Sequence, residues 1–193
     1  MVVRRPGNTE YLIVAYHVPP MSHEDTLPLM ILDAVMSGAK AVRSGPSFVR
    51  SGRLYKSLVQ SQLATSAYST YQESVDPYLY TFFITARNRV PVEKVERALL
   101  REIDRICTKP PTKKEMKRAA SQTEAQFAYA TDGITGMAYL LGSAELRIGY
   151  HYLEDLTERL MAVERKEVQR VAEAYLSEGN RTVGVFRPTE GVQ

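Results

Sequence analysis

The sequence of 193 residues contains one cysteine, no tryptophan and only three histidines. The single cysteine, Cys107, excludes an internal disulfide, so cysteine usage leaves the redox compartment open. No apolar run is long enough to cross a bilayer. The first ten residues, MVVRRPGNTE, lack the apolar segment of a signal peptide. We therefore expect neither a membrane span nor a secretory leader in this chain, and its localisation stays unknown.

A strong charge of either sign is also missing. The chain has 25 Lys and Arg against 22 Asp and Glu, which gives a formal net charge of +3. This small excess is spread along the sequence and argues against a nucleic-acid partner. Hydrophobic residues make up 44%, an ordinary globular share. We expect residues 1–193 to form a single domain with a sizeable core.

The residue types that carry most enzyme chemistry are scattered. His17 lies in a predicted strand, His23 precedes a predicted helix, and His151 lies in a distant turn. No zinc site, which needs three or four converging ligands, is therefore expected. Cys107 closes an amphipathic helix, a position more typical of core packing than of a nucleophile. Neither a G-x-S-x-G elbow nor a Walker phosphate loop occurs. The residues predict no catalytic set and no cofactor in this chain.

Strand patterns occur in three parts of the sequence. Residues 10–18, EYLIVAYHV, are apolar and rich in β-formers, which predicts a strand buried on both faces. Residues 64–73 alternate with a period of two, and the turn SVDP leads to a second strand over 78–88, so these two should form an antiparallel hairpin. A last strand is predicted over 182–187. In the first hairpin strand, the alternation places Ala64, Ser66, Tyr68 and Thr70 on one face and Leu63, Thr65, Ala67, Ser69 and Tyr71 on the other.

Helical patterns fill most of the remaining chain. Asp25 is the expected N-cap of a helix that begins near Thr26 and ends before Gly38. Thr112 and Glu115 form a capping box for another helix. Further helices are predicted over 54–59, 91–106, 134–146, 153–161 and 166–176. Because these amphipathic helices need an apolar partner, we predict an α+β two-layer sandwich: a mostly antiparallel sheet covered on one face by helices.

The ordered set of motifs resembles the second domain of the M16 zinc metallopeptidases, the pitrilysin, insulinase and mitochondrial processing peptidase group. Gly52-Arg53-Leu54-Tyr55 stands where that domain has Ser-Arg-Leu-Tyr, and the resemblance spans almost the whole chain. It implies the M16 metallohydrolase-like fold. Its segments are EYLIVAYHVPP, HEDTLPLMILDAVMSG, SGRLYKSLVQSQLATSAYS and the closing VERKEVQRVAEAYLSEGNRTVGVFRP.

The resemblance also implies where the zinc belongs. In this family the HxxEH motif lies in the first domain, so zinc is expected there, outside this chain. Some second domains supply an Arg and a Tyr that bind substrate, and these places fall at Val59 and Ser66. A valine cannot donate a hydrogen bond, and a serine is too short to replace a phenol. The remaining candidates for substrate binding are Arg53, Tyr55 and Tyr68, the last on the same strand face as Ser66.

The leading interpretation is a non-catalytic C-terminal domain of an M16-type zinc metalloendopeptidase, which closes a peptide-binding chamber opposite a zinc domain. Its partners would be that N-terminal domain, a second M16 subunit in a homo- or heterodimer, and a peptide substrate. The alternatives are an inactive scaffold or assembly domain of the same superfamily, and an unrelated α+β binding module. An HxxEH motif upstream in the parent protein would favour the peptidase.

Both versions of an M16 domain predict an apolar surface that faces another domain. We expect it around the glycine-spaced loop of residues 38–52 and on the exposed side of the strand 63–71. The loop carries Lys40, Arg43 and Arg50. These cations would either favour acidic peptide segments near the chamber mouth or simply be solvated.

Overall fold

The computed structural model describes residues 1–39 and 52–189. Within these residues five strands form one sheet in the order β1-β5-β2-β4-β3. All neighbouring pairs are antiparallel except β1 and β5, which run parallel. The strands are β1 (Val2–Pro6), β2 (Tyr11–Val18), β3 (Ala64–Tyr71), β4 (Tyr78–Ala86) and β5 (Arg181–Thr189).

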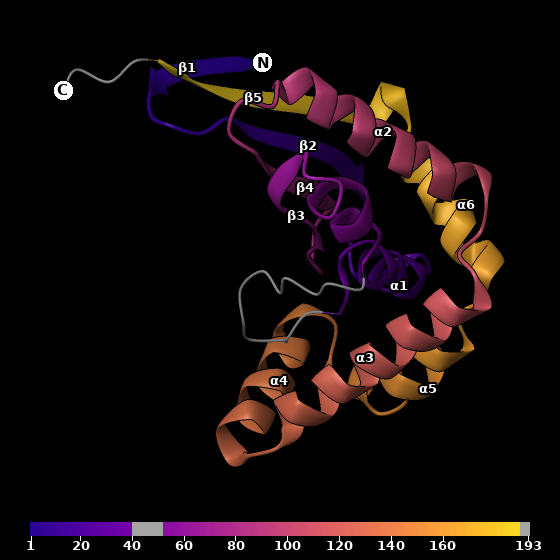
Figure 1. Cartoon of the computed structure of the whole chain (residues 1–193). Coiled ribbons are helices and arrows are strands. Elements are labelled where there is room, and N and C mark those ends of the chain that lie inside the picture. The colour runs from indigo at the N-terminus through magenta and orange to yellow at the C-terminus, as the bar shows by residue number, and fades with distance from the viewer. Residues whose placement is uncertain (40–51, 190–193) are drawn as a thin grey trace.

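The helices lie on one side of this sheet (Figure 1). Helices α1, α2 and α6 contact the strands, and α3 and α5 pack against α1. This arrangement confirms the predicted α+β two-layer fold. The helices are α1 (Thr26–Ser37), α2 (Val92–Thr108), α3 (Lys113–Thr131), α4 (Ile134–Arg147), α5 (Leu156–Ala162) and α6 (Arg165–Tyr175), with short helical turns η1 (Tyr55–Val59), η2 (Tyr150–Leu153) and η3 (Glu178–Asn180).

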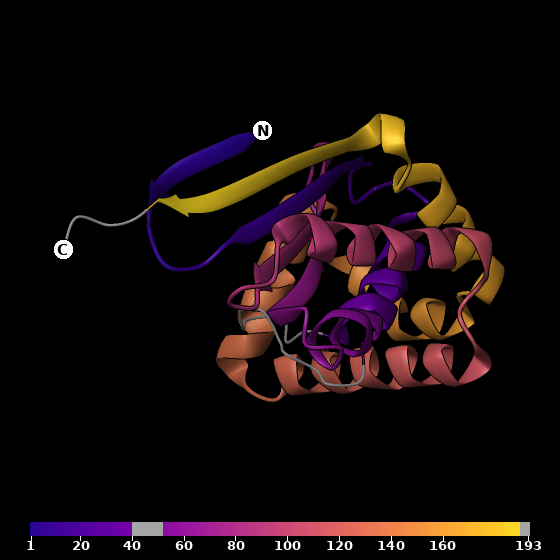
Figure 2. The ribbon, with the colours of Figure 1, turned by 45° about the horizontal axis from the view of Figure 1, so that its top comes forward.

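The first strand, β1, was not predicted from the sequence. It is short, contains two adjacent arginines and is largely exposed on both faces, so it has no alternating pattern. It pairs with β5 at the opposite end of the chain. Figure 2 shows that β1 and the end of β5 extend past the helical layer. The edge of the sheet therefore projects from the body of the domain.

The prediction that β2 is buried on both faces is wrong. Leu12 and Val14 are fully buried, whereas Tyr11 and Ile13 are 45% and 42% exposed. Both faces of the strand are apolar, so the composition resembled that of a strand between two layers. Helices cover only one of them. The second face is an apolar surface with no partner among the described residues.

The predicted hairpin of β3 and β4 is confirmed, but the alternation in β3 is interrupted near its start. A bulge between Ala64 and Ser66 adds one residue to β3 relative to β4. Ala64 therefore faces the core together with Ala67. The prediction that Ala64 shares a face with Ser66 and Tyr68 is wrong. Beyond the bulge the predicted alternation holds, and Ser66 and Tyr68 share one face.

Buried hydroxyl groups connect α1 to the sheet. The hydroxyl of Ser69 donates to Asp33 Oδ1 over 2.5 Å and accepts from the hydroxyl of Tyr80 over 3.1 Å. The Ser69 amide donates to Ser37 Oγ. Each of these polar groups lies in the core and would be costly to bury alone. The network therefore fixes how α1 lies across β3 and β4.

Helix α1 begins at Thr26, as predicted from Asp25 at the N-cap position, but the Asp25 side chain makes no capping hydrogen bond. Its carboxylate instead accepts hydrogen bonds from the Tyr175 hydroxyl, over 2.6 Å, and from Arg170. Burial raises the pKa of Asp25, but these two donors outweigh it and hold the pKa below its usual value. The buried carboxylate thus joins the start of α1 to α6.

A close backbone contact requires glycine at position 52. A Cβ atom there would lie 2.6 Å from the carbonyl oxygen of Met36 and 2.8 Å from the carbonyl carbon of Ser37. Both atoms belong to the last turn of α1, which packs against β3 and cannot retreat easily. The absence of a side chain at Gly52 therefore allows the chain to pass this helix end and begin η1.

We predict that Gly52→Ala lowers the free energy of unfolding by about 1–3 kcal/mol, because the added methyl group must displace backbone. Gly142→Ala is the matched control, since nothing lies within 4 Å of its Cβ position in α4. That control should raise the free energy of unfolding by up to about 1 kcal/mol, because alanine favours a helix. Urea denaturation measures both. Equal effects of the two substitutions would contradict the close contact.

Candidate functional site

The predicted site residues do not converge on one site. Tyr55 is the first residue of η1 and is half-buried, and Arg53 lies two residues before it, on the helical side of the sheet. Val59 ends η1 and packs, half-buried, against the core. Ser66 and Tyr68 lie on the face of the sheet opposite the described helices. The structure therefore brings together only the last two.

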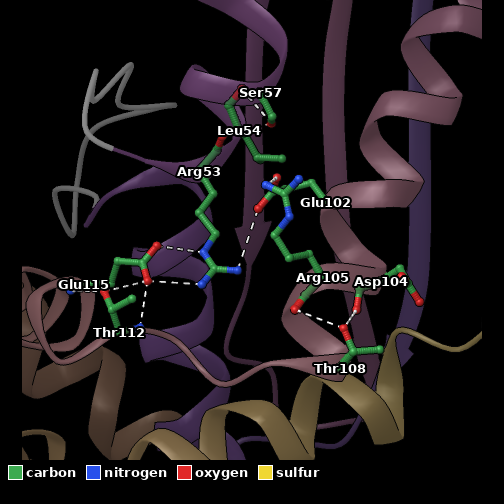
Figure 3. A network of polar contacts seen from close by, with 9 residues as sticks. All are labelled: Arg53, Leu54, Ser57, Glu102, Asp104, Arg105, Thr108, Thr112 and Glu115. Atoms are coloured by element: carbon green, nitrogen blue, oxygen red, sulfur yellow. Dashed lines mark hydrogen bonds and ion pairs between the residues drawn. The ribbon is translucent and has the colours of Figure 1, made fainter.

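Arg53 is held by two carboxylates in the helical layer (Figure 3). Its Nε donates to Glu115 Oε1 over 2.8 Å, and its Nη2 donates to Glu115 Oε2 over 3.1 Å. Its Nη1 lies 3.7 Å from Glu102 Oε1, and the side chain is only 11% exposed. Bidentate pairing of this kind fixes the plane of the guanidinium group. Arg53 thereby anchors η1 to both α2 and α3.

The predicted capping box at the start of α3 is confirmed and belongs to the same network. The amide of Thr112 donates to Glu115 Oε2 over 2.7 Å, and the Glu115 amide donates to Thr112 Oγ1 over 3.2 Å. Burial raises the pKa of Glu115, but the hydrogen bonds from Arg53 and Thr112 outweigh it and lower the pKa to about 2. Glu115 thus serves as the helix cap and as the counter-ion of Arg53.

This network gives Arg53 a structural role. Two carboxylates surround its guanidinium group, so little positive charge is left for a ligand. Burial raises the pKa of Glu102, and Arg105 and Arg53 oppose that effect. A sequence motif of the Arg-Leu-Tyr type points to this position without showing the two acidic partners, which lie far along the chain. A contact of Arg53 with peptide stays a prediction.

The face of the sheet opposite the helices carries a band of apolar side chains, which we call the open face. It consists of Tyr11, Ile13, Tyr68, Phe83 and Phe186. Strand pairing places Tyr68, Phe83 and Ile13 side by side across β3, β4 and β2. The rings of Tyr68 and Phe83 stack with centroids 5.2 Å apart, and those of Tyr11 and Phe186 lie 5.7 Å apart. The surface predicted on the strand 63–71 is therefore part of a wider band.

The histidines lie apart, and they do not fit a zinc site. His17 is exposed on β2, His23 Nδ1 lies 3.6 Å from Asp25 Oδ2, and His151 Nδ1 lies 2.8 Å from Glu154 Oε1. Within residues 1–39 and 52–189 no group of three or more His, Cys, Asp or Glu could hold a metal ion.

Two further sequence-based expectations concern the loop and the membrane. Lys40, Arg43 and Arg50 lie outside the described residues, so the expected role of the basic loop stays a prediction. Among the helices that the structure describes, none is long and apolar enough to span a bilayer.

We predict that Glu115→Gln lowers the free energy of unfolding by about 2 kcal/mol at pH 7, because it removes charge-assisted hydrogen bonds. A lowered folded-state pKa stabilises the fold above the unfolded value of 4.5, and that contribution is lost as the pH falls toward 2. The difference between variant and wild type should therefore shrink over this interval. Urea denaturation at several pH values measures it.

The control for this experiment is Glu124→Gln, which changes an exposed carboxylate on the same helix. Its effect should be small at every pH. Asp25 also loses stabilisation in acid, but it does so equally in wild type and variant, so it cancels in the comparison. A pH-independent deficit in Glu115→Gln would contradict the ion pair.

The chain has sequence relatives among known proteins. The chain is 24% identical over 183 residues to the mitochondrial-processing peptidase subunit beta of Blastocladiella emersonii. The aligned residues cover 94% of this chain and 39% of that protein. The chain spans about 40% of the length of the curated relatives it matches. It therefore corresponds to one part of larger proteins.

Solved structures show the same fold. A protease from Helicobacter pylori superposes with a TM-score of 0.87 at 18% identity, over 97% of this chain and 43% of that one. The inactive peptidase domain solved from Bordetella parapertussis superposes with a TM-score of 0.81 at 24% identity, over 99% of this chain and 97% of that one. At these identities the likeness is one of fold.

The family model described as the peptidase M16 inactive domain matches residues 1–123, more than half of the sequence. The match includes the whole sheet except β5, together with α1, α2 and the Arg53 network. The resemblance inferred from the motifs is confirmed: this chain belongs to the peptidase M16 inactive-domain family.

Proposed function

We propose that this chain is the non-catalytic domain of an M16-type zinc metallopeptidase and that it closes a peptide-binding chamber opposite a zinc-bearing domain. The observation that carries the proposal is the open face of the sheet. Tyr11 and Ile13 are nearly half exposed there beside three aromatic rings. Monomeric proteins rarely leave such a continuous apolar band in water, and bands of this kind mark interaction sites.

The architecture supports a domain as the partner that covers this face. The band runs over four strands, β3, β4, β2 and β5, so it is broad and flat rather than a pocket. The edge formed by β1 and β5 extends the sheet past the helical layer (Figure 2). Membership in an inactive-domain family, and a length of about 40% of the curated relatives, favour a zinc-bearing M16 domain as the occupant.

The division of labour follows from the residues. The described part of this chain has no group that could hold zinc, which supports zinc as the cofactor of the partner domain. At the family positions of the substrate-binding Arg and Tyr, the chain has Val59 and Ser66. We infer that it shapes and closes the chamber and that any such pair comes from another chain. The zinc domain could lie in the same protein or in a partner subunit.

A scaffold domain of the same superfamily is the second candidate. It would use the same open face but enclose no peptide, so association alone cannot separate the two functions. Cleavage of a peptide by the assembled complex can do so, because only the peptidase needs a chamber around a working zinc ion.

We predict that the chain binds a zinc-bearing M16 domain from its parent protein or partner subunit as a 1:1 complex in sedimentation velocity. Ile13→Glu should weaken this complex at least tenfold, because it buries an unpaired carboxylate in the interface. The matched control is Ile134→Glu at the start of α4, where the isoleucine is 91% exposed and far from the open face. Equal binding by both variants would overturn the proposed interface.

The same samples test catalysis. The chain alone should contain no stoichiometric zinc by metal analysis and cleave no peptide. The complex should contain zinc and cleave a fluorogenic peptide faster than the zinc domain alone. Association without any gain in cleavage would favour the scaffold function and refute chamber closure.

A further inference from the structure

A cavity of about 120 Å³ lies in the helical layer, on the side of the sheet away from the open face. Residues of α1, α3, α4 and α5 surround it, together with η2. Most of its wall is apolar and comes from Met30, Phe127, Leu140, Leu153, Leu156 and Leu160. An apolar cavity of about 150 Å³ in another protein is large enough to hold benzene. The cavity here is somewhat smaller than that one, so it could admit no more than a single ring.

Five polar side chains also line this cavity: Glu73, Thr123, Gln126, Arg147 and Tyr152. Arg147 Nη1 lies 3.8 Å from Glu73 Oε2 and donates to the Glu73 carbonyl oxygen over 3.4 Å. The hydroxyl of Tyr152 is buried and, among the described residues, has no hydrogen-bond partner. The guanidinium group of Arg159 lies 4.7 Å from the centre of the Tyr152 ring and holds it in place. A buried hydroxyl without a partner is costly, so a bound group that pairs with it would be favoured.

A wider groove of about 460 Å³ adjoins the cavity. The two share five wall residues: Met30, Glu73, Thr123, Leu140 and Arg147. The groove also borders Tyr139, which is 56% exposed. This groove is the route that a small molecule would take to the cavity.

We propose that this cavity binds a small neutral molecule with an aromatic ring and one hydroxyl group, such as a phenol. The ring would occupy the apolar part, and the hydroxyl would meet Tyr152, Glu73 and Arg147. Glu73 and Arg147 neutralise each other, so the cavity has little net charge to attract a charged ligand. Glu73 would repel a carboxylate ligand, and Arg147 would repel an ammonium ligand. A hydroxyl both donates and accepts, which suits this mixed set. The site is independent of the proposed chamber-closing function.

Methyl NMR of the 193-residue chain titrated with p-cresol, toluene or p-toluate tests the site. We expect p-cresol to shift the Ala144 methyl signal, since Ala144 is buried in the cavity wall, and to leave that of exposed Ala128 unchanged. Toluene should bind about three- to tenfold more weakly, because it lacks one hydrogen bond. The carboxylate p-toluate should not bind. No saturable shift at Ala144, or preferred binding of p-toluate, would overturn the proposal.

A conservative variant tests the hydroxyl directly. Tyr152→Phe keeps the ring and should keep the fold, which thermal unfolding can check. It should reduce the affinity for p-cresol about three- to tenfold and leave that for toluene unchanged. Tyr129→Phe, at a tyrosine that is 74% exposed on α3, is the matched control and should change neither affinity. An unchanged preference for p-cresol in a folded Tyr152→Phe variant would show that the ligand does not reach this hydroxyl, and the proposed site would be wrong.

Discussion

The strand β2 is apolar on both faces, and this constraint governs the rest of the structure. The side chains of Leu12 and Val14 are buried beneath the helices, while those of Tyr11 and Ile13 are exposed on the other face of the sheet. One helical layer can satisfy only one of these faces. The second face must therefore remain in contact with water or be covered by another domain. The proposed chamber-closing function corresponds to the second outcome.

The helical layer stays on its side of the sheet through a few polar contacts between distant segments. Asp25 joins α1 to α6, and Arg53 with Glu115 joins η1 to α3. The hydroxyl of Ser69 joins β3 to α1. Each contact uses a buried or half-buried group that would destabilise the fold if it were left alone. Such contacts specify one arrangement of apolar elements that could otherwise slide past each other.

Local signals in the sequence predicted most elements, whereas contacts between distant residues stayed hidden. The capping box at Thr112 and the start of α1 at Thr26 depend on neighbouring residues, so they were predicted correctly. The strand β1 was missed because it is short and its partner in the described sheet, β5, lies at the other end of the chain. For the same reason the sequence showed Asp25 as a cap and not its contact with Tyr175, which is 150 residues away.

Hydroxyl-radical footprinting with mass spectrometry tests whether another domain covers the open face. Labelling of Tyr11 and Tyr129 would be compared in the 193-residue chain and in its assembly with the zinc-bearing domain. Both tyrosines are exposed in the chain alone, at 45% and 74%. We predict that assembly strongly protects Tyr11 and leaves Tyr129 labelled. Protection of Tyr129 with unchanged labelling of Tyr11 would contradict it.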